Sequence, residues 1–109
     1  MDEVLAKATD LGKAIRATEK YRTLRAAEGA VMQDADCVKL AQALATLQGE
    51  RAAAERAGKP LDAPAQERLE KIAGAAALDP KLQALAKAQK EFQALVDDVS
   101  RTMLSELKP

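Results

Sequence analysis

The side chains that usually carry out catalysis are scarce in this chain. It contains no histidine, which removes the commonest general base and metal ligand. Its single cysteine, Cys37, cannot by itself supply the thiolates of a structural zinc or an iron–sulfur cluster. The carboxylates of Asp97 and Asp98 are adjacent, so they diverge around a helix and cannot share a substrate. No glycine-rich phosphate loop is present. These residues predict a protein that is not an enzyme, with no catalytic, cofactor-binding or metal site.

Cys37 is still the most reactive side chain available. It lies in the first turn of a helix that is expected to begin at Asp34, where the helix dipole can lower the pKa of a thiol and activate it. The alternative is an inert, partly buried cysteine, which is the commoner case by far. A redox or intermolecular role for Cys37 has no support from the sequence itself.

Five basic residues form the one charge cluster in the chain. Only Glu19 opposes them over the same interval, and a local patch of this kind can contact phosphates or an acidic partner. Tyr21 is the only aromatic residue nearby, so a platform for stacking single-stranded bases is missing. A solvated face, balanced by acids elsewhere, is the plainer interpretation. The candidate partner or RNA patch consists of Lys13, Arg16, Lys20, Arg22 and Arg25.

Helical signals position all of these residues. The first helix is expected over residues 2–16, with Gly12 on its apolar face as either a close-contact site or a tolerated substitution. Thr18 is placed to cap a second helix that ends near Gln33. Asp residues at helix starts, together with a glycine and proline stop over residues 58–60, delimit the remainder. The expected later helices run over 34–57, from 62 to about 78, and over 79–107.

The helix over residues 79–107 carries the longest apolar stripe in the chain. Its apolar residues recur at spacings of three and four, which is typical of an amphipathic helix that packs on neighbours. Gln89 interrupts this stripe, and the densest large apolar surface lies beyond it. We expect that surface to be part of a homodimer contact, with the intramolecular core as the main alternative. It consists of Phe92, Leu95, Val96, Val99 and Met103.

Composition places the chain among small helical proteins. The 109 residues are 48% hydrophobic, about half of them alanine, and the formal net charge is zero. The expected fold is all-α, a single domain over 1–109 with four to five helices in an open bundle of helical hairpins. Zero net charge excludes bulk attraction to nucleic acid or to membranes. Neither a signal peptide nor a membrane-spanning run is visible, so a cytoplasmic protein is expected.

The order of these signals resembles the YlbF/YmcA family of small bacterial helical proteins, which includes YheA-like members. The resemblance covers nearly the whole chain and rests on the caps and apolar positions taken together. It is carried by residues 8–15 (ATDLGKAI), residues 18–21 (TEKY) with Leu24, Asp34, Leu44, Gln48, Gly58, residues 78–80 (LDP), Leu85, Phe92, Leu95 and Val99.

This resemblance implies a dimeric bundle of helical hairpins that acts as a non-catalytic adaptor. Members of the family join a partner that modulates RNase Y, and iron–sulfur clusters are associated with that complex. Cys37 alone gives little support for a cluster in this chain. Three hypotheses follow: a regulatory adaptor that forms homodimers and binds protein partners such as an RNase-associated complex, a direct RNA-binding module that uses the basic patch, and a chaperone-like structural protein.

Overall fold

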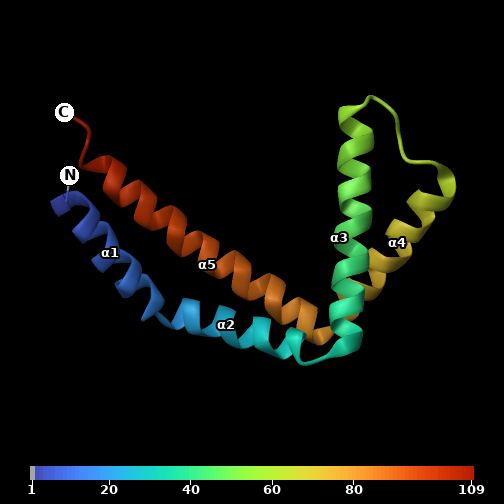
Figure 1. Cartoon of the computed structure of the whole chain (residues 1–109), viewed down its shortest axis with the longest axis horizontal. Coiled ribbons are helices and arrows are strands. Elements are labelled where there is room, and N and C mark those ends of the chain that lie inside the picture. Colours follow the sequence, from blue (N-terminus) through green and yellow to red (C-terminus); the bar gives the residue numbers. More distant parts are fainter. Residues whose placement is uncertain (1) are drawn as a thin grey trace. The chain divides into compact units, whose positions relative to one another are not determined.

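The computed structural model describes residues 2–109 and is helical almost throughout. No strand occurs among these residues, so the predicted all-α fold with a long C-terminal helix is confirmed. The first helix has the predicted bounds, and the others differ from the prediction by no more than two residues at any end. The five helices are α1 (Asp2–Arg16), α2 (Glu19–Met32), α3 (Ala35–Arg56), α4 (Ala63–Leu78) and α5 (Pro80–Ser105) (Figure 1).

Four of the helices begin at a side chain that accepts a hydrogen bond from the backbone. Thr18 Oγ1 accepts from the N–H of Tyr21 at 3.2 Å, and the Asp62 carboxylate accepts from the N–H of Ala65 at 2.9 Å. Asp34 and Asp79 accept from the first turns of α3 and α5 in the same way. Because these caps satisfy donors that would otherwise have no partner, each fixes a helix start locally.

The end of α3 is set by Gly58. This residue has a φ of 72°, in the left-handed region that favours glycine. The N–H of Lys59 donates to Ala54 O at 2.9 Å, and the N–H of Gly58 donates to Glu55 O at 3.1 Å. This pair of bonds is a Schellman motif, and it ends α3 where the sequence predicts a stop.

The chain divides into two compact units. We call residues 2–28 with Leu85–Pro109 the terminal unit, and Gly29–Ala84 the hairpin unit. Both divisions fall inside a helix, within α2 after Glu28 and within α5 after Ala84, so no loop linker separates the units. The single domain over 1–109 that the sequence suggests stays a prediction.

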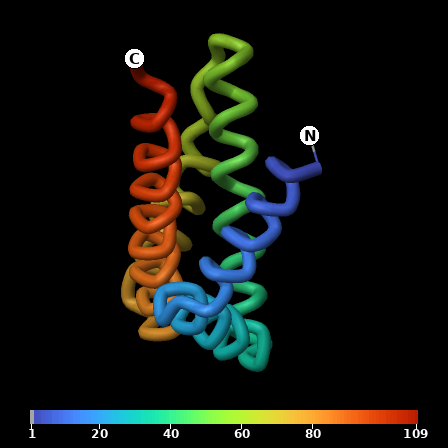
Figure 2. Tube along the Cα trace, turned by 90° about the vertical axis from the view of Figure 1, so that its left-hand side faces the viewer, coloured from blue at the N-terminus to red at the C-terminus, as the bar shows by residue number. Residues whose placement is uncertain are grey.

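The hairpin unit is built around α3 and α4, which pack side by side and run antiparallel (Figures 1 and 2), as predicted. Its buried side chains include Leu47 from α3 and Leu69 from α4, with Ala65 and Ala76 beside them on α4. Because alanines occupy two of these positions, the helices can approach closely. The unit therefore has a small core of its own.

The terminal unit joins α1 and the first part of α2 to the second part of α5, as predicted. The ring of Phe92 on α5 packs against the ring of Tyr21 on α2, with centroids 5.8 Å apart. Lys20 Nζ forms an ion pair with Glu91 Oε2 at 3.6 Å. In Figure 2 the N-terminal end of α1 diverges from α5. Ala88 is the one fully buried residue of this unit within the described chain. The terminal unit therefore lacks a core of large side chains.

Candidate protein-interaction surface

Large apolar side chains of the terminal unit are exposed on both of its long helices. On α1, Val4 is 65% exposed and Leu5 is 60% exposed. On α5, Met103 is 51% exposed and Leu104 is 59% exposed. Exposed large apolar side chains of this kind are candidates for contact with another protein. We use the name terminal apolar surface for six residues of this unit: Val4, Leu5, Leu11, Val99, Met103 and Leu104.

The five α5 residues singled out from the sequence fall into two groups. Four of them are half-buried, and Phe92 packs on Tyr21 within the terminal unit. Met103 is the exposed member. The stripe therefore supplies intramolecular contacts and also keeps area available for another chain. The half-buried residues are Phe92, Leu95, Val96 and Val99.

A shallow depression of about 260 Å³ lies between α1 and α5. Leu11 from α1 lines it together with Val99, Met103, Asp98 and Thr102 from α5. Because most of this lining is apolar and the depression is open, it fits a side chain of another protein better than a polar metabolite.

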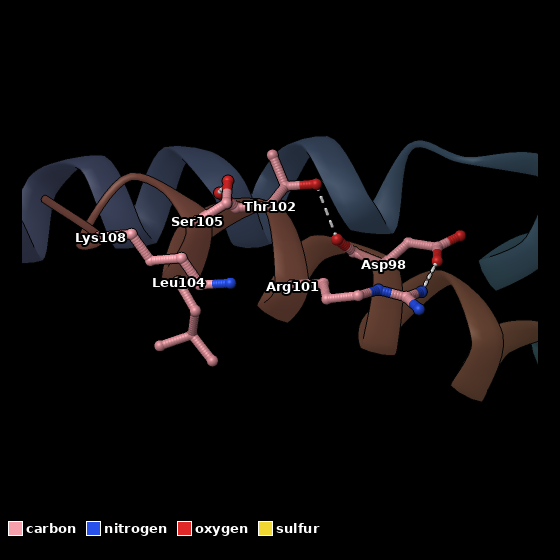
Figure 3. Close-up of a pocket in the computed structure, with 6 residues that line it drawn as sticks. All are labelled: Asp98, Arg101, Thr102, Leu104, Ser105 and Lys108. Atoms are coloured by element: carbon pink, nitrogen blue, oxygen red, sulfur yellow. Dashed lines mark hydrogen bonds and ion pairs between the residues drawn. The ribbon is translucent and has the colours of Figure 1, made fainter.

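A second, wider hollow of about 640 Å³ follows the last turns of α5 (Figure 3). Its polar groups are used locally: Arg101 pairs with Asp98, and Thr102 Oγ1 donates to Asp98 O at 2.8 Å. Leu104 points away from the helix in Figure 3. Arg101 and Thr102 therefore already have partners on their own helix.

All five residues of the basic patch are exposed, and three of them have partners within the chain. Lys20 pairs with Glu91, and Arg25 pairs with Glu28 at 3.2 Å. Arg22 Nη2 donates to Ala17 O at 2.6 Å. Lys13 and Arg16 lie in the last turn of α1, where a helix dipole favours positive charge. Fewer unpaired positive charges are therefore available in this patch than its five basic residues suggest.

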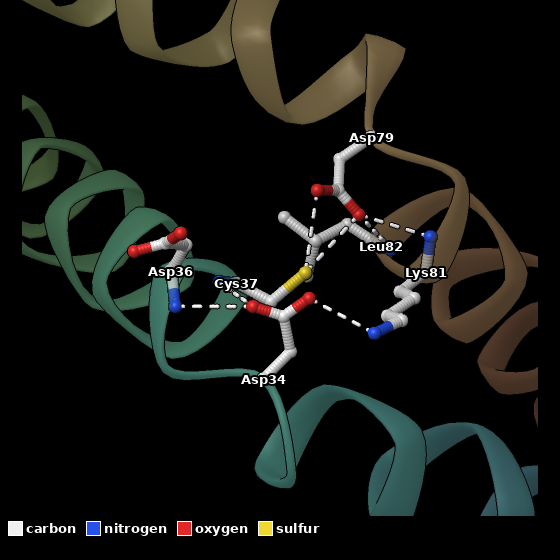
Figure 4. A network of polar contacts seen from close by, with 6 residues as sticks. All are labelled: Asp34, Asp36, Cys37, Asp79, Lys81 and Leu82. Atoms are coloured by element: carbon white, nitrogen blue, oxygen red, sulfur yellow. Dashed lines mark hydrogen bonds and ion pairs between the residues drawn. The ribbon is translucent and has the colours of Figure 1, made fainter.

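A polar network in the hairpin unit brings together the starts of α3 and α5 (Figure 4). Lys81 Nζ donates to Asp34 Oδ2 at 2.9 Å. The thiol of Cys37 lies 3.3 and 3.2 Å from the two carboxylate oxygens of Asp79. Each aspartate also caps its own helix. Two local caps are thereby joined into one contact between distant parts of the chain.

The network shifts the pKa values of its members in opposite directions. Hydrogen bonds from Lys81 and from the N–H of Cys37 lower the pKa of Asp34 to about 2. Backbone donation from Leu82, then the Cys37 thiol, lowers the pKa of Asp79. The Asp34 carboxylate raises the pKa of Lys81. Both carboxylates are therefore held ionised.

For Cys37, the activated thiol considered from the sequence is wrong. Burial first, and then the Asp79 carboxylate, raise the pKa of Cys37 to about 11, and the residue is only 2% exposed. The nearby acids and the loss of water outweigh the helix dipole. In the folded chain Cys37 is therefore a buried thiol whose raised pKa keeps it protonated at neutral pH.

Close packing at Gly12 is also absent. A Cβ atom built on this residue would meet nothing within 4 Å, so no described part of the chain approaches it there.

Each helix cap could be predicted from the sequence, but the hydrogen bond between Lys81 and Asp34, which lie 47 residues apart, could not. That pairing depends on tertiary structure and has no local signal.

In the part of the chain that the structure describes, no three or more His, Cys, Asp or Glu side chains are arranged so that they could hold a metal ion. Within residues 2–109, none of the helices is long and apolar enough to cross a membrane.

The described residues form a small all-α protein with exposed large apolar side chains on α1 and α5. Residues 4–108 match the sequence profile of the YlbF/YmcA family, described as control of the competence regulator ComK. The chain therefore belongs to the YlbF/YmcA family, as its sequence suggested. No protein of curated function matches it.

Two solved structures share the fold. One is Bacillus subtilis RicA in complex with RicF, with 18% identity, a TM-score of 0.76, and coverage of 96% of this chain and 93% of that chain. The other is a protein of unknown function from Bacillus stearothermophilus, with 21% identity, a TM-score of 0.79, and coverage of 96% and 92%. At these identities the likeness establishes the fold.

Proposed function

We propose that this chain is a non-enzymatic cytoplasmic adaptor that forms homodimers and binds a further protein through its terminal unit. The observation that carries the proposal is the lack of any large buried side chain in that unit, where Ala88 alone is fully buried among the described residues. A helical unit of this size gains stability mainly by covering apolar area. A second protein chain is the natural source of that cover.

Exposure at particular residues supports a specific surface. Met103 and Leu104 are more than half exposed on α5, and the depression beside Met103 can accept an apolar side chain. Burying one such side chain contributes roughly 1.5 to 3 kcal/mol. The terminal apolar surface can therefore contribute substantially to association.

The family and one structural relative support a protein partner. RicA, which shares the fold, was crystallised with RicF, and the family is described by its control of a regulator. The narrower form of the proposal is that this chain works in an RNA-processing complex of the RNase Y type. An RNA-processing enzyme among its specific partners would support that form.

The proposal is tested by affinity purification from the native host at near-physiological salt, with the full chain as bait. The informative variant is Met103→Glu, which places a charge on the terminal apolar surface. Leu78→Glu is the matched control, because Leu78 is 80% exposed and belongs to the hairpin unit. We expect one specific partner with the parent and with Leu78→Glu, and at least a tenfold loss with Met103→Glu, since burying an unpaired charge is strongly unfavourable.

The other functions predict different results. Salt-dependent RNA binding by the isolated chain, lost on substitution of Lys13 and Arg16, would favour the RNA-binding module. Suppression of aggregation of unrelated proteins would favour the chaperone-like role. Equal recovery of the partner with Met103→Glu and with the parent would contradict the proposed surface.

A further inference from the structure

We draw no further inference here: the strongest candidate, the exposed apolar face of α1 at Val4 and Leu5 in the terminal unit, carries none, because nothing in the structure shows what covers it.

Discussion

Cys37 illustrates how a single side chain is controlled by its surroundings. The thiol is buried, and it lies between two carboxylates that are themselves held ionised by helix N–H groups and by Lys81. Burial first, and then the carboxylates that cap the two helices, raise the pKa of this thiol. The chemistry of this residue serves the contact between α3 and α5 within the hairpin unit.

This environment predicts a loss of stability in alkali. The pKa of Cys37 is raised from 9.0 to about 11, so between these pH values the unfolded chain loses the thiol proton and the folded chain keeps it. Ionisation then favours the unfolded state, and the contribution of Cys37 to stability, fully present below pH 9, declines as the pH rises toward 11. Urea unfolding at several pH values should show this decline.

Cys37→Ala supplies the comparison. The variant should be less stable at neutral pH because it leaves a small cavity, and its stability should fall less steeply than that of the parent above pH 9. The raised pKa of Lys81 gives a slope of the same sign in both proteins, so the difference between them isolates the thiol. Identical slopes would show that Cys37 does not titrate as described.

At the scale of helices, the ends are encoded in a few neighbouring residues. Thr18, Asp34, Asp62 and Asp79 each accept N–H donors two or three residues further along the chain, so each helix start could be predicted without tertiary information. Gly58 likewise ends α3 with bonds that span no more than five residues.

The role of Gly58 predicts a clear cost of substitution. Gly58→Ala should lower the free energy of unfolding by about 1 to 2 kcal/mol, because a side chain disfavours the left-handed conformation. Gly74→Ala is the matched control, since Gly74 lies within α4 and a Cβ atom there would meet nothing within 4 Å. That change should instead stabilise the protein by up to about 1 kcal/mol. Thermal unfolding measures both, and equal effects would contradict the assigned Schellman motif.

Contacts between distant residues could not be predicted in the same way. The hydrogen bond from Lys81 to Asp34 joins residues 47 positions apart, and the contact of Cys37 with Asp79 spans 42. The local sequence pattern also could not tell which residues of the α5 stripe pack within the chain and which stay exposed. Phe92 packs on Tyr21, whereas Met103, in the same stripe, remains half exposed. Periodicity identifies an apolar face but not which neighbour covers it.

For the whole molecule, the two units differ in how well they are packed. The hairpin unit encloses Leu47 and Leu69, whereas the terminal unit leaves Val4, Leu5, Met103 and Leu104 more than half exposed. If a second copy covers these residues, the stability of the chain depends on its concentration, because association stabilises the folded state by mass action.

The most direct test of this account is the mass of the parent chain as a function of concentration. Sedimentation equilibrium from about 1 µM to about 100 µM covers the affinities expected of a specific dimer. We predict that the mass rises from 11.6 kDa toward twice that value, and that Met103→Glu shifts this rise to higher concentration. A strict monomer over the whole range would contradict the claim that the terminal unit is completed by a second copy.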